Sequence, residues 1–130
     1  MFQIDNQSRV AVYEQILHQA EKYILAGLLP PEEKLPSIRN LSVQLGVNPN
    51  TVQRAYTELE RAGLIVTAPG RGAFVTAESR QLIAEQRKKK SLEQMHILVD
   101  ELLRCGMTFN EIVSEIKIKG VHPITAKSGE

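Results

Sequence analysis

The sequence is poor in the residues that mark several protein classes. Its 130 residues include one cysteine, Cys105, so no disulfide can form within the chain, and a lone thiol suits a reducing cytoplasm. No stretch approaches the roughly 18 consecutive apolar residues that a membrane span needs. The N-terminal residues also lack the basic start and long apolar core of a signal peptide. We therefore expect a cytoplasmic protein with no membrane partner.

The chain also lacks the excess of basic residues that nucleic-acid-binding proteins usually carry. Its formal net charge is +1, and residues 1–78 hold seven Lys and Arg against eight Asp and Glu. Because phosphate contacts supply most of the affinity for DNA, composition alone does not favour that partner. With 42% apolar and 24% charged residues, the composition is that of a globular protein, and the length allows one ordinary domain with a short appendage.

The first half of the chain carries the pattern of a helix followed by a helix-turn-helix. Apolar spacing predicts an amphipathic helix over residues 10–26, and three prolines in residues 28–36 indicate an ordered loop held by its leucines. Ser37 is placed to cap a short helix. Asn48 is placed to cap a second helix over residues 49–62, which has a proline at its first position. Two short helices joined by a tight turn are a helix-turn-helix signature.

After the second of these helices, apolar residues no longer recur with the spacing of a helix but at about every second residue, as in a strand. Residues 64–67 and 73–76 are β-prone and flank a glycine-rich tip with Arg71 at its centre. A helix, a helix-turn-helix and a β-hairpin in this order describe a winged helix. We therefore predict a mainly α fold with a small β-hairpin, in which residues 1–78 form an N-terminal winged helix-turn-helix domain.

The rest of the chain is predicted to form a short helical dimerisation hairpin over residues 79–120. A long helix begins at Ser79, and Thr108 to Glu111 form a capping box that opens the last helix. We expect residues 121–130 to be disordered. A hairpin of this size cannot bury its own apolar face, so it should pack against a second copy, with packing onto the winged helix as the alternative. The predicted dimer-interface residues are Leu92, Met95, Leu98, Val99, Leu102, Leu103, Ile112, Val113 and Ile116.

Several motifs follow one another in the helix-turn-helix region. They are Leu35-Pro36-Ser37-Ile38-Arg39-Asn40-Leu41, then Gly46-Val47-Asn48-Pro49-Asn50-Thr51-Val52, then Ala55-Tyr56 with Leu59-Glu60, and finally Gly63-Leu64-Ile65. With these motifs the chain resembles the GntR family of bacterial transcriptional regulators over residues 9–76. Its two C-terminal helices are similar to those of the YtrA subfamily. The resemblance implies a DNA-binding dimer that is commonly a repressor, often of genes for ABC-type transporters.

The chain departs from the family pattern at three positions. The family usually has a glycine after the proline of the loop before Leu35, and Glu32 occupies that place, so we expect a slightly different loop path. Relatives with additional arginines in the second helix of the motif carry them where this chain has Pro49 and Gln53. The operator sequence of those relatives therefore does not carry over.

The first residues of the second helix of the motif are the predicted DNA readers. In this fold they enter the major groove and face base edges. Asn and Gln can pair with adenine, and Arg can pair with guanine. We predict Asn50, Gln53 and Arg54 as base-reading residues, and Asn48 and Thr51 as residues that combine capping with phosphate contact.

Two further elements are expected to contact DNA. Arg39 resembles an arginine that the family uses at the DNA surface, and Ser37 can offer its hydroxyl and backbone N–H to a phosphate. Arg71 can reach the minor groove or its phosphates, where Gly70 and Gly72 let the backbone approach closely. The plainer alternative is that the two capping residues only cap and that the arginines are solvated.

The predicted partner is double-stranded DNA with an inverted-repeat operator, because a dimer presents two recognition helices to two half-sites. The second hypothesis is a winged helix that binds another protein and no DNA, since a fold does not fix a function. No phosphate-binding glycine motif, paired carboxylates or cofactor fingerprint is present. We therefore predict no enzymatic activity, no cofactor and no metal site, and interpret His96 and Asp100 as a solvated pair. The sequence identifies no small-molecule effector.

Overall fold

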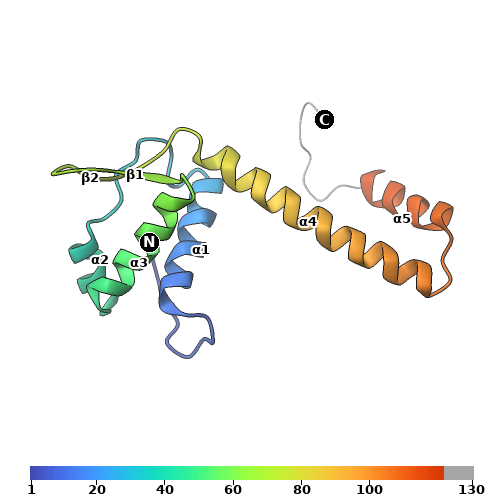
Figure 1. Cartoon of the computed structure of the whole chain (residues 1–130), viewed down its shortest axis with the longest axis horizontal. Coiled ribbons are helices and arrows are strands. Elements are labelled where there is room, and N and C mark those ends of the chain that lie inside the picture. Colours follow the sequence, from blue (N-terminus) through green and yellow to red (C-terminus); the bar gives the residue numbers. More distant parts are fainter. Residues whose placement is uncertain (122–130) are drawn as a thin grey trace. The chain divides into compact units, whose positions relative to one another are not determined.

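The computed structural model describes residues 1–121 and divides into two compact units, Met1–Arg87 and a second unit that begins at Lys88 (Figure 1). The predicted fold class is confirmed, because this part of the chain is mainly helical with a two-stranded antiparallel sheet. None of the helices within residues 1–121 is long and apolar enough to cross a membrane. In chain order the elements are α1 (Val12–Leu25), α2 (Ile38–Leu45), α3 (Pro49–Arg61), β1 (Ile65–Ala68), β2 (Gly72–Val75), α4 (Ser79–Arg104) and α5 (Phe109–Val121).

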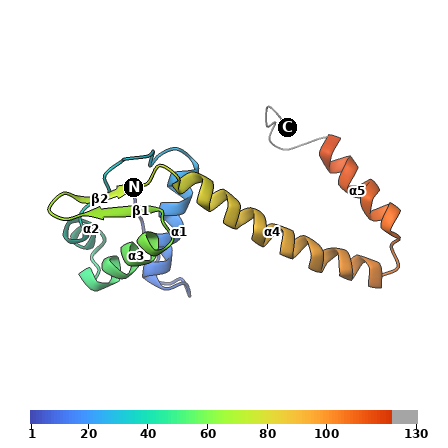
Figure 2. The ribbon, with the colours of Figure 1, turned by 45° about the horizontal axis from the view of Figure 1, so that its top comes forward.

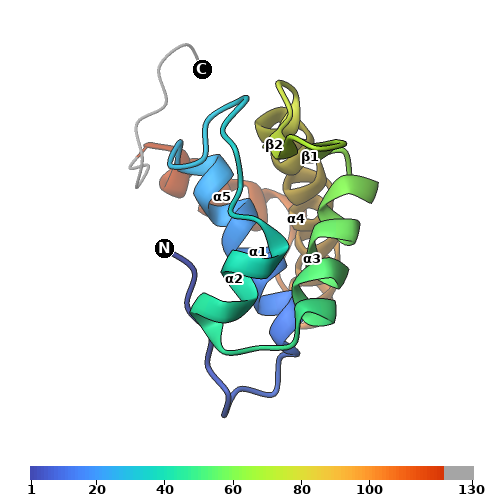
Figure 3. The same ribbon diagram turned by 90° about the vertical axis from the view of Figure 1, so that its left-hand side faces the viewer.

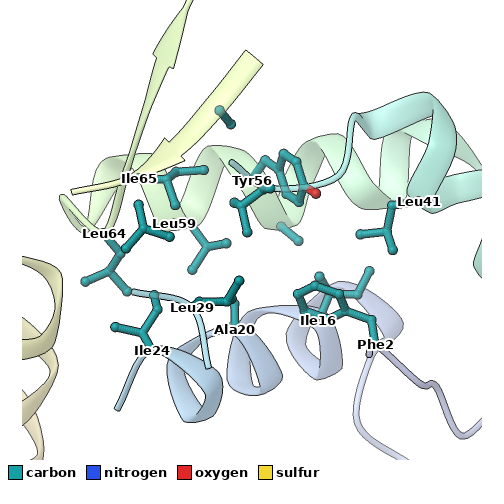
Figure 4. Packing of buried hydrophobic residues seen from close by; sticks show 14 of the residues in the cluster. Phe2, Ile16, Ala20, Ile24, Leu29, Leu41, Tyr56, Leu59, Leu64 and Ile65 are labelled. Atoms are coloured by element: carbon teal, nitrogen blue, oxygen red, sulfur yellow. The ribbon is translucent and has the colours of Figure 1, made fainter. Parts of the chain in front are cut away.

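The first three helices and the hairpin lie close together in the first unit (Figures 2 and 3). They enclose one apolar core. α1 contributes Ile16, Ala20 and Ile24, which recur every fourth residue and therefore share one face. α3 packs against both α1 and α2, and Figure 4 shows its buried side chains facing those of α1. Because one face of α3 is committed to this core, its polar face is left at the surface. The side chains that α3 buries are Val52, Ala55, Tyr56 and Leu59.

Local hydrogen bonds set the starts of α2 and α3, as predicted. The Ser37 hydroxyl accepts the backbone N–H of Asn40 at 3.0 Å, and Asn48 Oδ1 accepts the backbone N–H of Asn50 at 2.8 Å. Gly46 turns the chain between the two helices with φ 68°, a left-handed conformation that a Cβ disfavours. The predicted helix-turn-helix is therefore confirmed, with both caps in place.

The hairpin of β1 and β2 forms the wing. Ile65 lies opposite Val75, and both side chains are buried. Each strand lies one residue closer to the tip than predicted. Leu64 is not free to begin β1, because its backbone N–H donates to the carbonyl oxygen of Leu59 at 3.0 Å in the turn that closes the end of α3.

The loop before α2 is part of the wing. The backbone N–H groups of Glu32 and Leu35 donate to carbonyl oxygens of β2 at 2.7 and 2.8 Å. The loop therefore runs beside β2 as an irregular third strand, a pairing that the sequence did not predict. Leu29 and Leu35 are buried and hold the loop as expected, whereas Leu28 is exposed.

The first turns of α4 belong to the first unit. Ser79 and Ile83 are buried, and Ile83 packs into the core. The first unit consequently extends to Arg87, nine residues past the domain boundary expected at residue 78. α1 is shorter than predicted. It covers residues 12–25, whereas the sequence predicts a helix over residues 10–26.

The predicted capping box at the start of α5 is confirmed. The backbone N–H of Glu111 donates to Thr108 Oγ1 at 3.1 Å, and the backbone N–H of Thr108 donates to Glu111 Oε1 at 2.8 Å. The helix continues through Gly120 to Val121, one residue further than expected. The rest of the tail predicted to be disordered, residues 122–130, lies outside the described residues.

Candidate nucleic-acid interface

The polar face of α3 lies at the surface of the first unit. Asn50, Gln53 and Arg54 are exposed, and Thr51 is half-buried. The Gln53 side-chain amide donates to Thr57 Oγ1 at 3.3 Å, one turn further along the same face. Thr57 was not predicted as a site residue, although its spacing of four from Gln53 is a signal that places it there. This face carries the amide, hydroxyl and guanidinium groups that base edges and phosphates bind.

The start of α2 adds two predicted residues. Arg39 is exposed in the first turn of the helix. Ser37 uses its hydroxyl oxygen as a cap, and the hydroxyl proton can still be donated to a phosphate. Capping and phosphate contact are therefore compatible for this residue.

The tip of the wing presents Arg71 between two glycines with positive φ, 76° at Gly70 and 117° at Gly72. Arg71 is exposed. A Cβ built on Gly72 would lie 2.8 Å from Cε of Lys34, so the Lys34 side chain crosses the wing at this glycine. The sequence did not single out Lys34, because it reaches the wing only through the pairing of its loop with β2, where it lies opposite Phe74.

Two hollows flank the polar face of α3. A cavity of about 230 Å³ lies on one side, and Ser37, Gln53 and Gly72 are among the residues that line it. An open groove of about 470 Å³ lies on the other side, between the start of α1 and the residues Asn50, Thr51 and Arg54. The fold thus gathers the start of α2, the middle of α3 and the part of the wing next to its tip, which are separate in the sequence.

The distribution of ion pairs explains how a chain without a basic excess can meet DNA. Within residues 1–121 the sole ion pair joins Arg61 Nη1 to Glu58 Oε1 at 2.9 Å. Arg39, Arg54 and Arg71 consequently have no carboxylate partner in the described structure. Their charge remains available to a phosphate, even though the first unit holds nearly equal numbers of acidic and basic residues.

Arg54 makes a contact that the sequence did not predict. The central carbon of its guanidinium lies 3.8 Å from the centroid of the Tyr13 ring on α1. Such a cation–π contact restrains a long side chain that would otherwise be solvated. The sequence did not single out Tyr13, because no local signal connects it to a residue on another helix.

The second unit exposes most of the predicted dimer-interface residues. Val99 and Val113 are half-buried, whereas Ile112 is only 5% exposed. Ile112 therefore packs largely against its own helical hairpin, and its contact with a second copy stays a prediction. The remaining six, between 38% and 62% exposed, are Leu92, Met95, Leu98, Leu102, Leu103 and Ile116.

An open apolar groove of about 330 Å³ runs along this hairpin. Met95, Leu98 and Leu102 of α4 line it, together with Ile112 and Ile116 of α5. Further exposed apolar side chains in the same unit, which the sequence did not single out, are Ile97, Phe109 and Ile118.

Known proteins are similar to this chain in sequence and in fold. The profile described as "Bacterial regulatory proteins, gntR family" matches residues 12–75. The chain is 37% identical over 117 residues to the HTH-type transcriptional repressor YtrA of Bacillus subtilis (strain 168), with 90% of each protein covered. A transcriptional regulator from Oenococcus oeni superposes with a TM-score of 0.73 at 27% identity, covering 88% of this chain and 94% of that one. The DNA-binding domain of AraR in complex with operator ORX1 superposes with a TM-score of 0.51 at 28% identity, covering 56% of this chain and 90% of that one.

Proposed function

The chain belongs to the GntR family of bacterial regulatory proteins and is a DNA-binding transcriptional regulator, and on that premise we propose that it acts as a dimeric repressor of an inverted-repeat operator. The observation that carries the proposal is the polar face of α3, flanked by arginines that have no acidic partner within residues 1–121. A helix of about 10–12 Å diameter fits the major groove, which is about 12 Å wide. Asn50 and Gln53 then read base edges, while Arg39 at the start of α2 and Arg71 on the wing neutralise phosphates.

The AraR domain supports DNA as the partner of this fold, since its solved structure is a complex with an operator. The competing hypothesis, a winged helix that binds only another protein, does not account for three unpaired arginines on separate elements around one polar helix face. DNA therefore remains the partner that this surface fits best.

The exposed apolar side chains of the second unit support the dimer. Monomers rarely expose contiguous apolar patches larger than a few hundred Å². The surface presented by α4 and α5 is one that a second copy would cover. A twofold dimer presents two copies of α3 to half-sites one DNA turn or more apart, about 34–36 Å per turn, which requires an inverted-repeat operator.

The proposed repressor function and the proposed target genes are inferred from the similarity of this chain to its relatives. The B. subtilis relative is named a repressor, and the resemblance to the YtrA subfamily extends the proposal to genes for ABC-type transporters. A regulator of chromosomal genes works in the cytoplasm, so that location is part of the proposal. A dimer that occupies an operator overlapping a promoter blocks access of the polymerase.

Titration of the full chain with DNA from upstream of its own gene tests the proposal. Fluorescence anisotropy would be measured at several salt concentrations for the wild type, for Arg39→Ala and for Lys22→Ala, a control with the same charge change at the far end of α1. We expect specific binding that weakens steeply with salt, about tenfold or more weaker for Arg39→Ala and unchanged for Lys22→Ala. Absence of binding to any duplex at low salt would contradict DNA recognition and favour the protein-binding hypothesis.

The oligomeric state is tested by sedimentation equilibrium of the wild type, Leu98→Asp and Ile97→Asp. Leu98 and Ile97 are 62% and 66% exposed, but only Leu98 lines the apolar groove. We expect a dimer for the wild type and the Ile97 variant and a monomer for the Leu98 variant. A monomeric wild type at all concentrations would rule out the proposed dimer.

A further inference from the structure

We infer that Tyr13 is a positioning residue that holds Arg54 at the flank of α3, and that Arg54 contacts a DNA phosphate and does not read a base. This inference rests on the proposed DNA-binding function and assigns a role within it to a residue of α1. It also changes the role that the sequence alone suggested for Arg54.

The position of the guanidinium is the first observation. Gln53 and Arg54 are consecutive, so their side chains leave α3 about 100° apart. Gln53 lines the cavity on the side of the wing, whereas Arg54 lines the groove on the side of α1. Its guanidinium carbon lies 3.8 Å from the centre of the Tyr13 ring, which holds it beside α1.

The width of the major groove determines which DNA groups a side chain at this position can contact. A helix with its side chains nearly fills the major groove, so residues on its crest meet base edges and residues on its flanks meet the phosphate walls. Asn50 also lines the groove beside α1, so the feature that sets Arg54 apart is its contact with the Tyr13 ring. Asn50 and Gln53 remain the base-reading candidates. Tyr13 holds the Arg54 side chain to one side of α3, where it can contact a phosphate of the DNA backbone.

The chemistry of the pair suits a phosphate. Stacking uses one face of the planar guanidinium and leaves the N–H groups at its edge able to make two parallel hydrogen bonds to phosphate oxygens. Glu58 lies one turn along α3 from Arg54, yet its carboxylate pairs with Arg61 at 2.9 Å. The charge of Arg54 is therefore not neutralised within residues 1–121, and the ring restrains the side chain before DNA arrives.

A double-mutant cycle tests the positioning role. Affinity for the operator duplex would be measured for the wild type, Tyr13→Leu, Arg54→Gln and the double variant, with Tyr13→Phe as the control that keeps the ring. We expect each single variant to bind about tenfold more weakly, the double variant to bind no more weakly than Arg54→Gln, and Tyr13→Phe to bind within about twofold of the wild type. Losses that multiply in the double variant, or a Tyr13→Phe loss as large as that of Tyr13→Leu, would overturn the positioning role.

Salt dependence and base discrimination test the phosphate role without relying on Tyr13→Leu. For Arg54→Gln, the slope of log affinity against log salt should fall in magnitude by about 1, while the penalty for each base-pair substitution in the operator stays unchanged. Loss of discrimination at one base pair with an unchanged slope would make Arg54 a base reader and overturn the inference. If the wild type binds no duplex, the proposed DNA-binding function itself is wrong. That outcome is distinguishable from a failure of the roles inferred for Tyr13 and Arg54, in which the wild type still binds.

Discussion

The phenolic hydroxyl of Tyr56 on α3 donates a hydrogen bond of 2.6 Å to the backbone carbonyl oxygen of Pro36, in the loop before α2. Tyr56 is only 5% exposed. This bond joins α3 to the segment that places Ser37 and Arg39, so it fixes two parts of the candidate interface relative to each other. Burial also raises the pKa of the Tyr56 phenol above its ordinary value of 10.0.

Removing this hydroxyl should destabilise the first unit. Tyr56→Phe keeps the ring in the core but leaves the Pro36 carbonyl without its partner, which costs about 1–2 kcal/mol of unfolding free energy. Urea unfolding at pH 7 measures the change. A variant as stable as the wild type would show that water replaces the bond.

The same residue predicts a pH dependence at alkaline pH. Because the folded state holds the Tyr56 proton more tightly than the unfolded state, its contribution is fully present below pH 10.0 and is lost as the pH rises beyond that value. The stability difference between the wild type and Tyr56→Phe should therefore shrink above pH 10. Unfolding curves of both proteins across this range give the comparison, and a constant difference would contradict it.

Glu32 is the non-glycine residue with positive φ in the described structure, at 70°. It stands where the resembled family usually has glycine, and a Cβ in this conformation costs about 1–2 kcal/mol. Glu32→Gly should raise the unfolding free energy by about 0.5–1 kcal/mol, once the greater freedom of glycine in the unfolded chain is subtracted. The matched control is Glu33→Gly at the next position, which should be neutral or destabilising by thermal unfolding; equal effects of both would argue against strain at Glu32.

Asn48 offers a way to separate capping from DNA contact. Asn48→Ala removes the acceptor for the Asn50 N–H and should cost about 1 kcal/mol of stability. Asn48→Asp keeps the cap, so its stability should match the wild type, while its added negative charge should weaken DNA binding if the residue faces a phosphate. Thermal unfolding and anisotropy titration distinguish the roles, and undiminished DNA binding by Asn48→Asp would leave capping as its only role.

The capping box of α5 predicts a titration in the acid range. The backbone N–H of Thr108 and then its side chain lower the pKa of the Glu111 carboxyl from its ordinary value of 4.5. The ionised carboxylate therefore stabilises the hairpin above that value, and the contribution is lost as the pH falls through the lowered pKa. Thr108→Ala should move the Glu111 pKa, followed by NMR, partly back toward 4.5, whereas Ser114→Ala on the same helix should not move it.

The sequence predicts local structure correctly where residues a few positions apart decide it. Ser37 and Asn48 cap their helices with bonds to N–H groups two or three residues later, and Thr108 and Glu111 cap each other in the same way. Such bonds depend on local spacing and little else. The motifs of the helix-turn-helix, and with them the family, could therefore be read directly.

Only the tertiary structure decided which distant groups meet. The stacking of Arg54 on Tyr13, the pairing of the Glu32 loop with β2 and the burial of Ile83 join segments far apart in the chain. The sequence by itself determined the local elements and the polar face of α3, because hydrogen-bonding partners and apolar spacing lie within one or two helical turns. The neighbours of that face depend on packing in three dimensions, which no local pattern encodes.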